Sequence, residues 1–259
     1  MVLEVATTQS VDRLRVLYGA YMASGENYLM QSTRLNIKQW SEKYPIVQAN
    51  NGALIRMETN RVSRQQVFDT FAEVNHLGTL TEAFVAVMAW GFTPGRYGTF
   101  RTNAMLSNPR NGRTVQDVLE SAAGNSDPVA AYGELANALE QLGPAFGTKF
   151  LYFSSQPENR APIFDMVVAQ WLWRYGVRDA KGKWISPVGW NTKQYERYVN
   201  FCSEICSHLG IIDRGLVEYL MFVDSQYSEY LERGKTQVMW ITSAEPLGWP
   251  VSEPRPTAF

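Results

Sequence analysis

Apolar residues recur every three or four positions along most of this chain of 259 residues, and this spacing restricts it to a mainly helical fold. Residue types that cap helices precede several of the apolar runs, and Ser63, Thr114 and Asp165 are clear examples. We predict helices over residues 11–22, 64–74, 82–90, 115–122, 129–142, 150–153, 166–175, 193–209 and 214–231. Strand candidates are short and few, at residues 53–57, 184–185 and 238–241.

Charge and apolar run length narrow the class of protein. The 24 Lys and Arg residues nearly balance the 25 Asp and Glu residues, which argues against a protein that coats nucleic acid by bulk electrostatics. No apolar run reaches the length of about eighteen residues that a membrane span needs, and the N-terminus lacks the pattern of a secretory signal. We therefore expect a cytoplasmic protein without membrane contact, and we infer no obligate protein partner.

The cysteines and histidines do not form a recognisable metal or catalytic pattern. Cys202 and Cys206 lie four positions apart on a predicted helix, where two thiols are more often core residues than a disulfide or metal site. The two histidines, His76 and His208, are isolated, so a His-based triad is not expected. We expect no metal and no cofactor.

The segment Gly143-Pro-Ala-Phe-Gly-Thr-Lys149 follows a predicted helix and leads into an apolar run. Glycine permits a positive φ and a close approach of the backbone to a ligand, so we predict a turn here. Backbone amides exposed at the start of the following helix are suited to a DNA phosphate. The alternative is a plain connection between two core helices.

Two charged residues give this segment possible chemistry. Lys149 is predicted just inside a helix, where the positive end of the helix dipole favours a neutral, nucleophilic amine; it could equally be a phosphate clamp. Asp165 is the only charge in the apolar stretch 161–169 and is predicted to cap a helix. A capping carboxylate is held rigidly in its ionised form, which suits it to stabilise an oxocarbenium-like sugar.

This segment resembles the hairpin of the helix–hairpin–helix base-excision glycosylases, whose pattern is Leu-Pro-Gly-Val-Gly-x-Lys followed by Val-Asp. The matching residues are Pro144, Gly147, Thr148, Lys149 and Asp165. The chain departs from the pattern at Gly143 and Ala145, and also at Leu151. A longer set of motifs is similar to a bacterial group of 8-oxoguanine-glycosylase-fold proteins; these motifs lie at residues 88–91, 95–98, 101–102, 142–153 and 164–165.

The resemblance implies a helix–hairpin–helix DNA glycosylase fold, with two helical lobes around a DNA cleft, over residues 1–243. The Pro-rich residues 244–259 are predicted to form an extended tail. The implied activity is excision of a modified base from double-stranded DNA, which leaves an abasic site, in the cytoplasm of a bacterium. One member of the group removes glucosylated 5-hydroxymethylcytosine from phage DNA as a defence. The resemblance implies the same substrate and anti-phage role for this chain. Lys149 and Asp165 match the catalytic pair, with lyase activity left open.

Base extrusion needs a pocket and a wedge, and the segment from Trp90 to Arg101 has suitable residues. We predict a loop over residues 91–98, on its glycine and proline content. Four aromatic residues could supply stacking faces: Trp90, Phe92, Tyr97 and Phe100. Residues 83–116 contain no acid, so a positive surface is expected from Arg96, Arg101, Arg110 and Arg113. Predicted DNA contacts are Arg96 and Arg101, together with Gly143, Ala145, Gly147 and Thr148.

Three alternatives remain at this point. An 8-oxoguanine-type repair glycosylase/lyase would use the same residues on another base. A non-catalytic module would use the hairpin only for contact with the DNA backbone, and Asp165 would then be a cap alone. An all-α protein without a nucleic-acid role would use the hairpin to join two core helices, which the near-neutral charge favours.

Overall fold

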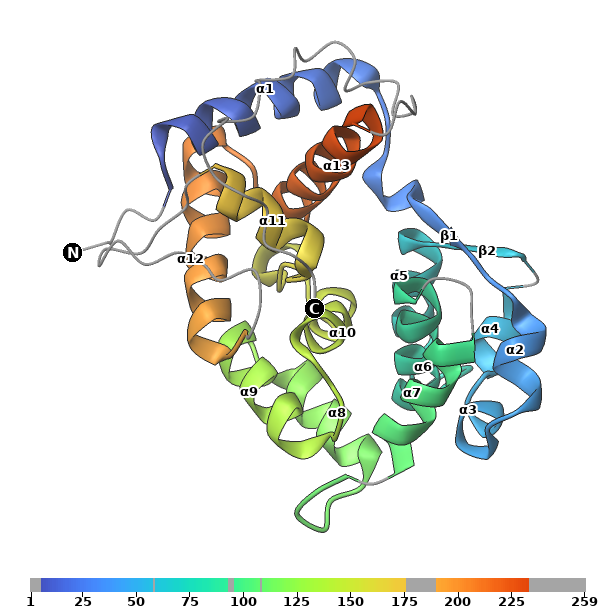
Figure 1. The fold of residues 1–259 in the computed structure, drawn as a ribbon. Coiled ribbons are helices and arrows are strands. Elements are labelled where there is room, and N and C mark those ends of the chain that lie inside the picture. The colour runs from blue at the N-terminus through green and yellow to red at the C-terminus, as the bar shows by residue number, and fades with distance from the viewer. Residues whose placement is uncertain (1–5, 58, 93–95, 108, 176–189, 233–259) are drawn as a thin grey trace. The chain divides into compact units, whose positions relative to one another are not determined.

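The computed structural model describes residues 6–57, 59–92, 96–107, 109–175 and 190–232, and it confirms the mainly α fold. Contacts divide the chain into two compact units: a central unit of residues 27–161, and a terminal unit of residues 1–26 and 162–259. Each unit is described here by itself (Figure 1). The predicted strands at 184–185 and 238–241, and the tail 244–259, lie outside the described residues.

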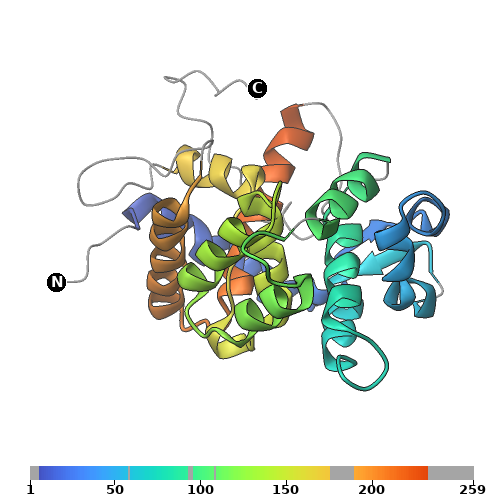
Figure 2. The same ribbon diagram turned by 90° about the horizontal axis from the view of Figure 1, so that it is seen from below.

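The central unit is built around a helix that is apolar on all sides. This helix, α6 (Leu80–Gly91), is capped by Thr79, and every residue from Ala83 to Met88 is fully buried. Its neighbours are α4 (Gly52–Arg56), α5 (Arg64–Ala72), α7 (Arg96–Ser107), α8 (Val115–Gly124) and α10 (Pro144–Ser154). The remaining helices of this unit are α2 (Ile37–Glu42), α3 (Pro45–Ala49) and α9 (Pro128–Ala138), with short 3₁₀ turns η1 (Tyr28–Met30) and η2 (Pro157–Asn159). Figure 2 shows α8, α9 and α10 packed together in green.

A two-stranded antiparallel sheet covers one end of this core. Strands β1 (Ser32–Arg34) and β2 (Arg61–Ser63) pair with Thr33 opposite Val62 and Arg34 opposite Arg61. Val62 is fully buried, and the Thr33 hydroxyl donates to the Trp90 carbonyl oxygen over 3.0 Å. One face of the sheet is therefore anchored to α6. The strand predicted at residues 53–57 is wrong, because residues 53–56 belong to α4 and Met57 is its C-cap.

Helices predicted from capping residues are confirmed, with shifted ends. Ser63 and Thr114 each form a capping box, at the starts of α5 and α8. The loop predicted over residues 91–98 is wrong at both ends, because α6 runs to Gly91 and α7 begins at Arg96; residues 93–95 lie outside the described residues. Gly98 lies inside α7, and a Cβ there would be 2.8 Å from Phe92 Cβ, so this glycine allows the helix to pack closely against Phe92.

The terminal unit contains α1 (Thr8–Ser24), α11 (Met166–Arg174), α12 (Thr192–Leu209) and α13 (Arg214–Glu232). Figure 1 shows α11 beside α13, which it contacts extensively. Cys202 and Cys206 are free thiols on α12, and Cys202 is fully buried. Burial raises the pKa of the Cys206 thiol to about 11, so both cysteines behave as core residues.

One buried carboxylate links three helices of the terminal unit. Asp224 on α13 pairs with Arg13 on α1, and it accepts hydrogen bonds from Trp171 Nε1 at 2.8 Å and Tyr175 Oη at 3.2 Å. Both members of the ion pair are at most 3% exposed. Burial and the Asp224 charge raise the pKa of Tyr175, so its hydroxyl remains a neutral donor. This network fixes the second half of α11.

Among the described residues, no helix is both long enough and apolar enough to cross a membrane. The same residues contain no group of three His, Cys, Asp or Glu side chains arranged to bind a metal ion.

We predict that Asp224→Ala lowers the free energy of unfolding by about 3–5 kcal/mol, because it leaves the Arg13 guanidinium buried without its counter-ion. Urea denaturation measures this change. Asp12→Ala is the matched control, since Asp12 pairs with Arg15 where both side chains are 58% exposed. The control should lose no more than about 1 kcal/mol. Equal losses in the two variants would contradict the assigned role of Asp224.

Candidate active site

The segment predicted as a glycine-rich turn is helical from its second residue. Gly143 is the N-cap of α10, with φ −78° and ψ 167°, and Pro144 occupies the first turn. The amide of Gly147 donates to the Gly143 carbonyl oxygen over 3.0 Å. The left-handed residue in the connection from α9 is Gln141, with φ 60°. The predicted turn over residues 143–149 is therefore wrong, because proline at the first position starts a helix there.

Two of the four predicted backbone contacts are buried. Gly147 faces α9, where an added Cβ would lie 3.2 Å from Tyr132 Cδ2. Thr148 is fully buried, and its hydroxyl donates to the Pro144 carbonyl oxygen over 2.7 Å. This burial does not support direct DNA contact by Gly147 or Thr148. Gly143 and Ala145 are half-buried at the start of α10.

Lys149 lies in the second turn of α10 and is only 7% exposed. The dipole effect falls off within the first turn, so the predicted influence of the helix start is not supported. The aliphatic part of the side chain instead passes over Gly91, the last residue of α6. A Cβ on Gly91 would lie 3.0 Å from Lys149 Cδ and 3.1 Å from Phe146 Cε1. Gly91 therefore provides the space that the lysine occupies.

The Lys149 ammonium lies beside a cluster of aromatic rings. Its Nζ is 5.6 Å from the centroid of the Phe146 ring, within the range of a cation–π interaction. Phe146 stacks on Phe92 with centroids 4.0 Å apart, and Phe92 contacts Tyr97 edge to face at 6.1 Å. We call Phe92, Tyr97 and Phe146 the aromatic platform. Phe146 was missed by the sequence reasoning, although its position three residues before Lys149 on one helix was a usable signal.

Arg101 fixes the aromatic platform to the connection between α9 and α10. Its Nε and Nη2 donate to the Gln141 carbonyl oxygen over 3.1 and 2.8 Å, and its Nη1 donates to Tyr97 Oη over 3.2 Å. The guanidinium is 5.9 Å from the Phe146 centroid. Much of its hydrogen-bonding capacity is therefore used within the protein. Arg96 begins α7, and its side chain lies outside the description.

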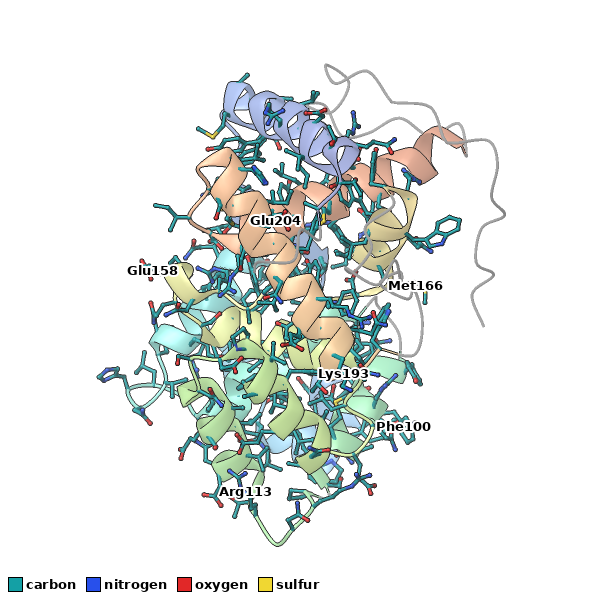
Figure 3. The ribbon with its side chains drawn as sticks, turned by 90° about the vertical axis from the view of Figure 1, so that its left-hand side faces the viewer. Phe100, Arg113, Glu158, Met166, Lys193 and Glu204 are labelled. Atoms are coloured by element: carbon teal, nitrogen blue, oxygen red, sulfur yellow. The ribbon has the colours of Figure 1, made fainter. Side chains whose placement is uncertain are left out.

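The four predicted stacking residues occupy different environments. Trp90 is 5% exposed and packs edge to face on Phe153, so its burial does not support a role as a wedge. Tyr97 and Phe100 are 62% and 50% exposed, and Phe92 is half-buried. Phe100 lies at the surface (Figure 3), with its ring 6.1 Å from that of Tyr44. Three of the four residues are thus exposed or half-buried.

The positive surface predicted from the acid-free segment is partly neutralised. Arg110 pairs with Glu140 at 3.3 Å and Arg113 pairs with Glu134 at 2.5 Å, and both acids lie outside the segment in sequence. Figure 3 labels Arg113 at the start of α8. The hydrogen bond from Arg113 holds the pKa of Glu134 below its usual value. Predicting charge from sequence alone missed these partners.

Asp165 belongs to the terminal unit, and its capping role is confirmed. Its Oδ1 accepts hydrogen bonds from the amides of Val167 and Val168 at 3.1 and 3.2 Å, and the side chain is half-buried. The preceding Phe164 is fully buried and stacks on Tyr198 with centroids 4.8 Å apart. Backbone amides thus orient the Asp165 carboxylate, and the packing of Phe164 fixes the chain just before it.

The match to a family model, with which the mainly α fold agrees, places this protein among the DNA glycosylases. Residues 26–222, or 197 of 259, match the model of the family described as "Putative 8-oxoguanine DNA glycosylase OGG-like protein". The chain belongs to that family. No curated protein and no solved structure matches it significantly.

We predict that Gly91→Ala costs about 1–3 kcal/mol of unfolding free energy relative to Gly124→Ala, because the new methyl group meets Lys149 and Phe146. Gly124 is the matched control: it also ends a helix of the central unit, and an added Cβ there meets nothing within 4 Å. The control should be neutral or up to about 1 kcal/mol more stable, from helix propensity. Chemical denaturation of both variants tests the contact, and indistinguishable stabilities would rule out a tight slot.

Proposed function

We propose that this protein extrudes a modified base from double-stranded DNA and cleaves its N-glycosidic bond, with Lys149 and Asp165 as the catalytic residues. The observation that carries the proposal is the burial of Lys149 against the aromatic platform, in a chain of a DNA glycosylase family. Lysine is among the residue types least often buried, so a lysine that is 7% exposed and packed over Gly91 points to a role for its position.

The aromatic platform supports a role in base extrusion. A flipped base is held by stacking on aromatic rings, and Tyr97 and Phe92 offer faces that are exposed or half-buried. In this proposal Phe100 is the candidate wedge, and Arg96 and Arg101 reach phosphate. The half-buried Gly143 and Ala145 lie at a helix start, where a phosphate is favoured.

The proposed chemistry divides between the two residues. As the bond from C1′ to the base breaks, the base leaves with the electron pair and the sugar becomes cationic. The Asp165 carboxylate, oriented by two amides, stabilises that charge. In a bifunctional enzyme the lone pair of the Lys149 amine then forms a bond to C1′. The C1′–O4′ bond of the sugar ring breaks, one N–H proton passes to O4′, and a protonated Schiff base remains. In a monofunctional enzyme water attacks instead, and Lys149 positions DNA.

The substrate proposed is glucosylated 5-hydroxymethylcytosine in phage DNA, with anti-phage defence as the biological role. The resemblance to the bacterial group with that activity supports it. An 8-oxoguanine-type base is the second candidate, and the description of the matched family favours it.

We expect Asp165→Asn to lower the rate of base release at least about a hundredfold, because the carboxylate charge opposite the sugar cation is lost. Asp127→Asn is a matched control, since Asp127 caps α9 by accepting from the amides of Val129 and Ala130 in the same way. Asparagine caps as well as aspartate, so both variants should fold normally. Mass spectrometry of bases released from duplexes with modified bases gives the rates. Parent-like release by Asp165→Asn would show that its role is structural only.

The role of Lys149 is tested by borohydride trapping on the duplex that supports release. A bifunctional enzyme should give a covalent protein–DNA adduct that Lys149→Gln abolishes and Lys193→Gln, at an exposed lysine (Figure 3), retains. Active parent enzyme without an adduct would remove Lys149 as the Schiff-base residue. DNA binding without any abasic product would instead favour the non-catalytic alternative.

A further inference from the structure

A second surface of the central unit carries positive charge around a hollow of about 920 Å³. Its cations are Arg34 on β1, Lys38 on α2 and Arg61 on β2. None of the described residues lining it is acidic. We call this hollow the basic groove. On a chain with a net charge of −1, three cations from three elements around one hollow are a local concentration of charge.

The two arginines of the basic groove are cross-strand neighbours on β1 and β2. Arg34 and Arg61 are directly paired in the register of β1 and β2, and both are exposed. Like charges at directly opposite positions destabilise a sheet. A pair of this kind is explained when an anion lies between or over the two guanidinium groups, because each then gains a charge-assisted hydrogen bond.

The Arg61 guanidinium is held in place by Ser32, two residues before Arg34 on β1. Its Nε donates to Ser32 Oγ over 2.9 Å and its Nη2 donates to the Ser32 carbonyl oxygen over 3.0 Å. The opposite face of the sheet is anchored by buried Val62 and by the bond from Thr33 to Trp90. Holding a guanidinium on a rigid strand lowers the entropy lost when it binds a ligand.

The third cation of the basic groove, Lys38, forms only a long ion pair. Lys38 Nζ is 3.9 Å from Glu42 Oε1, and the two side chains are 76% and 60% exposed. Such an exposed pair contributes little and is easily exchanged for a phosphate. The apolar wall of the groove includes Ile37 and Ile55, which are 37% and 55% exposed, so the hollow is open at the surface.

We infer that the basic groove binds the phosphodiester backbone of DNA, at a site separate from Lys149 and the aromatic platform. An open hollow with cations on three elements suits a chain of phosphates better than a single small anion. The inference rests on the DNA binding implied by the family, and it does not require base excision. Contacts of this kind add affinity without reading sequence.

The test is the salt dependence of binding to an unmodified duplex, measured by fluorescence anisotropy with the full chain. Replacing Arg34 and Lys38 together (Arg34→Gln with Lys38→Gln) should reduce the slope of log affinity against log salt by about 1–2 and weaken binding at least about tenfold near 0.1 M salt. The matched control removes two exposed cations elsewhere, Arg15→Gln with Lys193→Gln. The control should keep the parent slope.

The melting temperature of the variant distinguishes the loss of DNA contacts from damage to the fold. Arg34→Gln alone should melt at or above the parent temperature, because it relieves the like-charge pair with Arg61, while still weakening DNA binding. A lower melting temperature together with an unchanged salt slope would overturn the inference. Equal weakening in the control variant would also overturn it, as would equal protection against melting by inorganic phosphate and by DNA at matched phosphate concentration. Absence of base release from every duplex would affect only the proposed excision.

Discussion

The close approach of α6 and α10 at Gly91 is the constraint on which the candidate active site depends. Because Gly91 has no side chain, Lys149 can extend across it with its Cδ 3.0 Å from where a Cβ would be. The same contact brings Phe146 within 3.1 Å of that position, and Phe146 in turn stacks on Phe92. A single small residue thus determines both where the amine lies and where the aromatic rings lie. Larger residues at this position would separate the two helices or displace the lysine.

The terminal unit uses two aspartates for different purposes, and their surroundings account for the difference. Asp224 is buried and binds Arg13, Trp171 and Tyr175, so its charge is fully used in holding α1, α11 and α13 together. Asp165 is half-buried at the start of α11, where two amides orient its Oδ1. The first carboxylate stabilises the helix on which the second one is displayed. Rigid support of this kind is what a preorganised electrostatic group requires.

Features set by neighbouring residues in the chain were predictable, and features set by distant contacts were not. The cap at Asp165 follows from one residue and the amides just after it, so the helix start was predicted correctly. The glycine content predicted a loop at Gly98, yet this residue lies inside α7, where it packs closely against Phe92. The contact between Gly91 and Lys149 joins residues far apart in sequence, and no local pattern encodes it. The burial of Lys149 likewise depends on tertiary packing, which the spacing of apolar residues in the sequence does not reveal.

The most direct test of the central claim is a crystal structure of the protein bound to duplex DNA that carries an uncleavable analogue of the excised nucleotide. The account predicts that the sugar of the extruded nucleotide contacts Lys149 Nζ and the Asp165 carboxylate within hydrogen-bonding reach, about 2.6–3.2 Å between heavy atoms, or through one water. It also predicts that the base stacks on the aromatic platform. An extruded nucleotide bound elsewhere, with Lys149 still covered against Gly91 and Phe146, would contradict the account.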